Sequence, residues 1–389
     1  MPLRFSRRAQ GIQPSATLAV PAKARQLKAS GIPVLSFGSG EPDFPSPRSA
    51  SDAAHAAIDR GESHYTANSG IPELKDAVSN YYRNRFALEY ASAEIIVTSG
   101  AKPLLYEAIQ TLVDPGDEVL LFAPAWVSYV EQINLAGGKP VTVDTANTLF
   151  SPTRESVESR LTKKTVGMII NTPNNPTGAV YDSATLQMLA EIAEKNDLWI
   201  VFDEIYERLV YGEARHHNIV QLLPRIRERV LIANGVSKAY CMTGWRIGYA
   251  LGPKELIGKI DALQSHLTSN ASSIAQWAAV GAIDNAEEDV ERCRLAFERR
   301  RDLICASISE IPNLRLQKPQ GAFYLFIDVR DTPLPDDMEF CTRLLEERYV
   351  ALVPGTAFLA PGFVRMSYAC SEEDIKEGAR RIEDFVKSL

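Results

Sequence analysis

The chain has 389 residues, which corresponds to roughly two or three domains of ordinary size. Hydrophobic residues make up 45% of the chain and charged residues 23%, which is typical of a globular protein and excludes collagen-like and low-complexity chains. The net charge is −7, so no overall positive field favours nucleic acid or an anionic membrane, and we expect neither as a partner.

The first 45 residues contain several prolines and no long sheet pattern, so we predict an arm, residues 1–45, that joins the second of two domains. Within it, the segment from Ser15 to Pro21 is interpreted as a proline-broken loop and a candidate lid over a cleft. The residues at the start of the chain lack the apolar run of a signal peptide, and no apolar run is long enough to span a membrane. We therefore expect a cytoplasmic protein.

From about Ile95 to Gly252, short β-branched and apolar runs alternate with longer helical patterns. This alternation predicts an α/β domain with a mostly parallel, seven-stranded sheet, which we place in residues 46–287. The predicted strands are Ile95–Thr98, Glu118–Phe122, Lys139–Thr142, Val166–Ile170, Trp199–Phe202, Val230–Ala233 and Ile247–Ala250. In such sheets the ligand lies beyond the carboxyl ends of the strands, so the residues there are the candidates for chemistry.

After Gly252 the pattern changes to long helical periodicity, over Leu256–Gln264 and Ala275–Cys305. Three strand-like segments follow, GAFYLFIDV, ALVPGTAF and VRMSYA. We predict a smaller α+β domain over residues 288–389.

Five cysteines are scattered along the chain, with no CxxC pair and no His at metal-ligand spacing. We expect them to be free thiols that fill the core in a reducing compartment, and we expect no metal site.

Ser237 and Lys238 directly follow the apolar run VLIAN. A lysine at a strand end inside a cleft loses hydration, and its amine then becomes neutral and nucleophilic. Arg246, eight residues later, carries the planar fork that binds a phosphate through two hydrogen bonds. Taken alone, Lys238 could equally be a surface charge and Arg246 part of a structural salt bridge.

Asp203 ends the run WIVF and begins DEIY, which places Tyr206 three residues later on the same side of a helix. A carboxylate at this edge would keep a heterocyclic nitrogen protonated, because opposite charge favours the protonated form. The same residues would also suit a magnesium ligand or a helix cap.

Ser99–Lys102 (SGAK) join a predicted strand to a predicted helix, and amide groups at a helix start suit a phosphate. No GxGxxG follows any strand, which argues against a dinucleotide-binding dehydrogenase. Residues 171–178, NTPNNPTG, are too rich in proline for a regular element and predict a rigid loop at the same edge. Asn175 in this loop is a candidate donor to an oxyanion, with a tight structural turn as the alternative.

In order and context these segments resemble the fold-type I pyridoxal-phosphate enzymes of the aspartate aminotransferase (class I/II) family. The resemblance spans nearly the whole chain. It is carried by PSATLAVPAKARQL, SGEPDF, YTANSGIPELKDAV with Tyr65, SGAK, Trp126, NNPTG, DEIY, the pair Ser237 and Lys238, GWRIGY, VPGTAF and VRMSYA with Arg365.

The resemblance implies that Lys238 holds pyridoxal phosphate as a Schiff base and later moves the proton between substrate and cofactor. Asp203 is then the partner of the ring nitrogen, Tyr206 and Asn175 bind the phenolic oxygen, and Trp126 stacks on the ring. The residues implied around the cofactor phosphate are Ser99, Gly100, Ala101, Lys102, Ser237 and Arg246. In the family a tyrosine of the partner subunit also reaches this phosphate, and Tyr65 matches it, so a homodimer is implied.

For the substrate, the resemblance assigns Arg365 to the α-carboxylate, assisted by Gly40, with Trp126 and Asn175 also in contact. One subgroup binds a distal carboxylate with an arginine located after GWRIGY, but residues 247–291 contain no arginine. A second subgroup uses a lysine beside the phosphate loop together with serine and threonine of the arm. The matching residues are Lys102, Ser15 and Thr17. Alternatively, Lys102 points to solvent or neutralises the phosphate.

The leading hypothesis is a transaminase that exchanges amino groups between aspartate or glutamate and oxaloacetate or 2-oxoglutarate by a ping-pong mechanism. The alternatives are an aromatic, alanine or prephenate aminotransferase, or a related enzyme that cleaves carbon–sulfur bonds or closes a cyclopropane ring. A cofactor-sensing regulator is a further alternative. It would need a basic DNA-binding segment, and the residues before the resemblance are too few for one.

Overall fold

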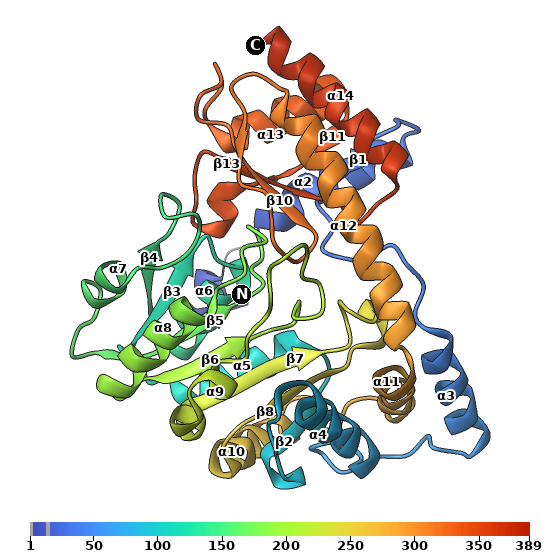
Figure 1. The fold of residues 1–389 in the computed structure, drawn as a ribbon, viewed down its shortest axis with the longest axis vertical. Coiled ribbons are helices and arrows are strands. Elements are labelled where there is room, and N and C mark those ends of the chain that lie inside the picture. The colour runs from blue at the N-terminus through green and yellow to red at the C-terminus, as the bar shows by residue number, and fades with distance from the viewer. Residues whose placement is uncertain (1–2, 13–15) are drawn as a thin grey trace.

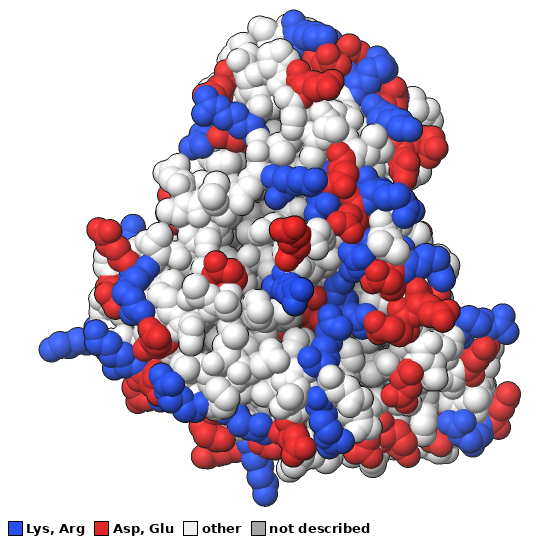
Figure 2. Space-filling view, in the orientation of Figure 1, with Lys and Arg blue, Asp and Glu red and all other residues white. Residues whose placement is uncertain are grey.

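The computed structural model describes residues 3–12 and 16–389. Figure 1 shows a large sheet flanked by helices on both faces and a smaller sheet stacked beyond one of its ends. The long helix α12 (Glu287–Ser309) runs between the two. Lys and Arg are interspersed with Asp and Glu over the face in Figure 2.

The large sheet has seven strands in the order β2-β8-β7-β6-β5-β3-β4. Strand β8 is antiparallel to both of its neighbours, and the other pairings are parallel. The strands are β2 (Ile95–Thr98), β3 (Glu118–Ala123), β4 (Lys139–Asp144), β5 (Thr165–Asn171), β6 (Trp199–Asp203), β7 (Val230–Gly235) and β8 (Gly248–Leu251). All seven predicted strands and the α/β fold class are therefore confirmed.

The strands read as continuous apolar runs because both faces of the sheet are buried. In β3, Leu120 and Phe122 pack into one core, while Val119 and Leu121 pack into the core on the opposite face. The helices that accompany this sheet are α3 (Arg48–Asp59), α4 (Pro72–Phe86), α5 (Ala101–Leu112), α6 (Val127–Ala136), α7 (Arg154–Glu158), α8 (Ser183–Lys195), α9 (Ile219–Leu222), α10 (Lys254–Ser265) and α11 (Ser273–Asn285).

The smaller sheet is antiparallel, with the order β12-β13-β10-β9, and β1 pairs separately with β11. The predicted segments GAFYLFIDV, ALVPGTAF and VRMSYA contribute β10, β12 and β13, whereas β9 lies outside all three and was not predicted. The elements of this part are β9 (Arg315–Leu316), β10 (Tyr324–Asp328), α13 (Asp337–Arg348), β11 (Val350–Ala351), β12 (Val353–Pro354), β13 (Phe363–Ser367) and α14 (Glu372–Ser388).

The predicted helical stretch Ala275–Cys305 consists of two helices, because α11 ends at Asn285 and α12 begins at Glu287. The first turn of α12 is acidic, and negative charge stabilises the N-terminus of a helix. Periodicity alone did not show this break, because apolar spacing continues across Ala286.

The N-terminal segment contacts the smaller sheet. Its strand β1 (Leu35–Ser36) pairs in parallel with β11, and Phe37 O accepts from Ser367 N at 2.8 Å. The prediction of a loop from Ser15 to Pro21 is wrong for the residues that the structure describes, since α2 (Ala16–Ala29) runs through Pro21. Pro21 is the sixth residue of α2, past the first turn in which a proline costs no hydrogen bond, so α2 continues through it with one backbone hydrogen bond fewer. The division into 1–45, 46–287 and 288–389 stays a prediction.

The remaining short elements are α1 (Arg7–Gly11) and the 3-10 turns Ser92–Glu94, Pro224–Arg229, Thr243–Trp245 and Gly355–Phe358. Of the helices in residues 3–12 and 16–389, none is both long and apolar enough to cross a membrane.

Candidate active site

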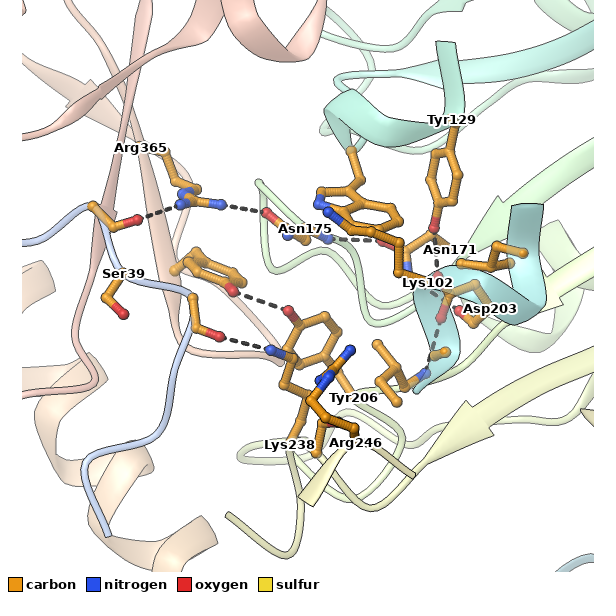
Figure 3. Close-up of a pocket in the computed structure, with 18 of the residues that line it drawn as sticks. Ser39, Lys102, Tyr129, Asn171, Asn175, Asp203, Tyr206, Lys238, Arg246 and Arg365 are labelled. Atoms are coloured by element: carbon orange, nitrogen blue, oxygen red, sulfur yellow. Dashed lines mark hydrogen bonds between the residues drawn. The ribbon is translucent and has the colours of Figure 1, made fainter. Parts of the chain in front are cut away.

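A cavity of about 520 Å³ lies beyond the carboxyl ends of β5, β6 and β7, where the loops of the large sheet meet the smaller sheet (Figure 3). Most of the predicted site residues line it, although they come from segments far apart in the sequence. The predicted residues in its wall are Gly40, Ala101, Lys102, Trp126, Asn175, Asp203, Tyr206, Ser237, Lys238, Arg246 and Arg365. The structure therefore assembles one site from these separate motifs.

Lys238 follows β7, and its amine is enclosed in this cavity. Its Nζ donates to the backbone oxygen of Gly40 at 2.7 Å. Burial and the positive charges of Arg246 and Arg365 together lower the pKa of Lys238 to about 8. Roughly a tenth of this amine is therefore neutral, and so nucleophilic, at pH 7, and the neutral fraction grows above that pH.

Asp203 is the last residue of β6 and lies buried at the floor of the cavity. Its Oδ2 accepts from the Tyr129 hydroxyl at 2.6 Å, and its Oδ1 accepts from Ile205 N at 3.2 Å. Burial raises the pKa of Asp203 to about 6, and these two hydrogen bonds oppose the rise. The carboxyl group is thus mainly an anion at pH 7.

The prediction that Asp203 and Tyr206 lie on the same side of a helix is wrong. Turns follow β6, and only tertiary packing brings Tyr206 to the site.

The loop between β2 and α5 leaves room for a ligand only because residue 100 is a glycine. Gly100 has a φ of 99°, and a Cβ there would lie 2.4 Å from Arg246 Nη2. Gly248 in β8 is equally tight, since its Cβ would lie 2.4 Å from Ala101 N. This close approach places Arg246 beside the amides that begin α5, where an anion is favoured. Ser99 lies next to Arg246 in the two adjoining cavities.

Arg365, on β13, faces the cavity from the smaller sheet. Its Nη1 donates to Asn175 Oδ1 at 2.8 Å, and its Nη2 donates to the backbone oxygen of Gly38 at 2.8 Å. The guanidinium carbon lies 4.4 Å from the centre of the Tyr324 ring, and the Tyr324 hydroxyl is 2.9 Å from that of Tyr206. Arg365 is only 4% exposed and its Nε has no partner, so a buried donor remains for an anionic ligand.

Lys102 also lines the cavity, and its side chain is at the same time exposed to solvent. Its Nζ lies 4.8 Å from the centre of the Trp126 ring, a cation–π distance. Burial lowers its pKa, and Arg246 contributes to this shift. Figure 3 shows Lys102 and Arg365 on different sides of the cavity, so two cations can reach one small ligand from separate directions.

Five predicted residues are not among those that line this cavity, namely Ser99 and Gly100 of the loop before α5, and Tyr65, Ser15 and Thr17. Tyr65 is 91% exposed and lies outside the cavity of its own chain. Ser15 lies outside the described residues, and for Thr17 only the backbone, in α2, is described.

Sequence reasoning missed several residues of the wall, namely Arg25, Ser39, Tyr129, Asn171 and Tyr324. Tyr129 could have been found, because it lies three residues after Trp126 at the start of a helical pattern. Asn171 orients the loop by accepting from Asn175 N at 2.9 Å. No motif marked Tyr324, whose position depends on how the smaller sheet packs.

No group of three or more His, Cys, Asp or Glu side chains gathers as a metal would require anywhere in the described ranges. The groups that the cavity offers for chemistry are an amine with a lowered pKa, a buried carboxylate and several cations.

Comparisons with known proteins agree with this arrangement. The family described as aminotransferase class I and II matches residues 32–382. An aspartate aminotransferase of Geobacillus stearothermophilus is 44% identical over 99% of this chain and 100% of that protein, and an aspartate/prephenate aminotransferase of Cereibacter sphaeroides is 43% identical over 97% of each. The solved aspartate aminotransferase of Rhizobium meliloti superposes with a TM-score of 0.95 at 40% identity and 99% coverage of both chains.

A structure of the Thermus thermophilus aspartate aminotransferase with maleate gives a TM-score of 0.94 at 42% identity, with both chains fully covered. The chain thus matches members of one family in sequence, in fold and over nearly its whole length. The chain belongs to the class I and II aminotransferases, and it is an enzyme of the transaminase type.

Proposed function

We propose that this aminotransferase uses pyridoxal phosphate and moves amino groups between an acidic amino acid, aspartate or glutamate, and a 2-oxo acid. The observation that carries the proposal is the joint placement of Lys238, Asp203 and Arg365 around one cavity. An amine with a lowered pKa, a buried carboxylate and a buried arginine with an unpartnered donor are costly to desolvate, and together they match one charged ligand.

The residues present fit the cofactor at each of its functional groups. The glycine-dependent approach of residues 100–102 to Arg246 forms a cradle for a phosphate. Lys238 provides the amine for the aldehyde, and Asp203, held by Tyr129, provides the anion for the ring nitrogen. Trp126 offers an aromatic face, and Tyr206 and Asn175 lie where they can bind the phenolic oxygen.

When bound, pyridoxal phosphate supplies an aldehyde that receives the amino group and a ring that withdraws electrons from the Cα–H bond of the substrate. The chain supplies the rest. Asp203 would hold a proton on the ring nitrogen because its carboxylate is buried and anionic. Lys238 would carry the proton between the Cα of the substrate and the aldehyde carbon of the cofactor. Arg365 would fix the α-carboxylate through its two-pronged guanidinium, which would orient that C–H bond toward Lys238.

Lys102 is proposed to bind the distal carboxylate of the substrate. It shares the cavity with Arg365, and no arginine occurs in residues 247–291 to take this role. The relatives named as aspartate aminotransferases support an acidic substrate, as does the Thermus structure with maleate, which is a dicarboxylate. Relatives named aspartate/prephenate aminotransferases make prephenate the second candidate, as an amino acceptor.

The Lys102 proposal is tested by substituting Lys102→Met in the cofactor-loaded enzyme. A hydrogen bond to a charged group contributes roughly 1.5–3 kcal/mol, so kcat/KM for aspartate should fall about tenfold to a hundredfold, whereas the value for alanine should change less than about threefold. Half-reactions with single amino acids, followed by cofactor absorbance, give both numbers. Lys259→Met, at an exposed position of α10, is the matched control and should behave as the parent enzyme.

Equal losses for aspartate and alanine would mean that Lys102 serves the phosphate, and conversion with aromatic amino acids alone would refute the acidic substrate. The second candidate is tested by supplying prephenate as the amino acceptor to the enzyme in its aminated form.

The cofactor is tested separately by borohydride reduction and peptide mass analysis. The added mass should be on the peptide that contains Lys238, and Lys238→Ala should abolish it together with turnover. Mass on another lysine would contradict the assignment.

A further inference from the structure

Two of the five cysteines meet in the structure. Cys241 lies three residues after Lys238, and Cys293 lies in the second turn of α12, 52 residues away in sequence. Their Sγ atoms are 3.8 Å apart, and the Cys241 thiol donates to Cys293. This contact could not be predicted from the sequence, because neither cysteine belongs to a CxxC motif. They were expected to be separate core thiols, and they form a pair instead.

The pair borders a cavity of about 350 Å³ that is distinct from the active site. The loop from Phe44 to Arg48 and the first turns of α12 line this cavity together with both cysteines. Cys293 is 5% exposed and Cys241 is half-buried, so a molecule of a few atoms in the cavity can meet the sulfur atoms.

The electrostatics make the two sulfur atoms unequal. The hydrogen bond from Cys241 and the positive charge of Arg292 lower the pKa of Cys293, while burial and its own role as donor raise the pKa of Cys241. A thiolate is the reactive form of cysteine, so Cys293 reacts first and Cys241 lies in place to react second.

We propose that Cys241 and Cys293 are a reversible oxidation site, at which a small hydroperoxide forms a disulfide that ties the Lys238 segment to helix α12 and slows turnover. The formation of the disulfide does not depend on the proposed substrate, and only its effect on turnover rests on the proposed function.

The step balances with hydrogen peroxide as the oxidant. The Cys293 thiolate attacks one peroxide oxygen, the O–O bond breaks, and the departing oxygen leaves as water after taking a proton. The Cys293 sulfenic acid is then attacked by Cys241, which forms the S–S bond and expels the second oxygen as water. Two thiols and one peroxide become one disulfide and two waters, and a dithiol reductant reverses the change.

The effect on activity follows from where the two cysteines lie. A disulfide requires an S–S distance of about 2.05 Å, so the two Sγ atoms must approach by roughly 1.8 Å. Rotation of the two side chains and movement of the Cys241 loop toward α12 share this approach. Cys241 N donates to Lys238 O at 3.2 Å, which transmits a shift of the loop to the lysine. Helix α12 packs against α14 and β9 of the smaller sheet, so the bond would also join the lysine loop to that sheet. A misplacement of about 1 Å can cost about a hundredfold in rate.

The first test is chemical and does not require activity. The cofactor-loaded enzyme is treated with hydrogen peroxide, quenched, alkylated and digested with trypsin. Peptides 239–246 and 293–294 should appear joined, with the loss of two hydrogens, and should separate after reduction. Cys370→Ser, which replaces the other half-buried cysteine, should still give the joined peptides, whereas Cys241→Ser and Cys293→Ser should not.

The second test is kinetic. The oxidised parent enzyme should lose at least about tenfold in kcat and recover it on reduction, while both serine variants, fully active before treatment, should keep their activity under the same oxidant. The absence of joined peptides, or an unchanged kcat in enzyme shown to be joined, would overturn the proposal. If the enzyme did not act on aspartate or glutamate but the peptides were joined, the proposed function would be contradicted and the proposed oxidation site would stand.

Discussion

At Lys238, burial and two neighbouring guanidinium groups act on the amine in the same direction. The pKa of about 8 lies well below the ordinary value of 10.5, so the amine of the cofactor-free enzyme is charged below pH 8 and neutral above it. Because only the neutral amine attacks an aldehyde, the rate of covalent cofactor attachment should rise with pH through about 8 and level off above it. Borohydride trapping of Lys238 at timed intervals measures this rate.

Arg246→Gln removes one of the two cations and should move this midpoint upward. Since Arg246 also belongs to the phosphate cradle, the comparison is made with a phosphate-free aldehyde. A midpoint near 10.5 in the parent enzyme would contradict the proposed electrostatics.

Three of the predicted site residues lie at or shortly after the carboxyl end of a parallel strand. Asp203, Lys238 and Asn175 could be placed at one edge because parallel strands end on the same side of a sheet. Tyr324 could not be predicted to join them, because its position depends on the packing of the smaller sheet against Tyr206. The meeting of Cys241 with Cys293 is of the same kind, since no local pattern links a loop to a distant helix.

Among the elements, helices α3 and α11 pack closely against each other, and Gly281 makes this close approach possible. A Cβ at Gly281 would lie 2.4 Å from Ser49 O and 2.7 Å from Ala53 Cβ. Gly281→Ala should therefore lower the free energy of unfolding by about 1–3 kcal/mol, because the two backbones must move apart. Urea unfolding measures the change.

Gly258, within α10, is the matched control, since a Cβ there meets no atom within 4 Å. Gly258→Ala should be neutral or stabilise the enzyme by up to about 1 kcal/mol, because alanine favours helix more than glycine. Equal effects of the two substitutions would mean that the α3–α11 contact does not restrict residue 281 to glycine.

The strands were predictable as elements because their apolar runs report burial on both faces. Helix ends were not, because they depend on local charge and on tertiary contacts. The break at Ala286, the passage of α2 through Pro21 and the turns after Asp203 each follow from such interactions, and periodicity in sequence does not record them.

For the whole molecule, we propose a homodimer in which Tyr65 reaches the phosphate of the neighbouring site. Its side chain is 91% exposed in the single chain, which is unusual for a large aromatic residue. If each subunit lends Tyr65 to its partner, a hybrid of one Tyr65→Ala and one Lys238→Ala subunit contains one complete site.

Mixed subunits should therefore regain activity that neither variant has alone, up to about half of the parent value per dimer. Purified hybrids carrying two different affinity tags allow this measurement. If Tyr65 served its own subunit, the hybrid would hold no complete site, and its activity per dimer would be about half that of the Tyr65→Ala homodimer.

The hydrogen bond from Lys238 to Gly40 connects the chemistry of the site to the beginning of the chain. Gly40 follows the stretch that pairs with β11, whereas Lys238 extends from β7, so this single bond bridges the two sheets. Under the proposed function, the cofactor aldehyde would compete with this carbonyl for the amine of Lys238. Loading of the cofactor would then weaken the link between Gly40 and the large sheet.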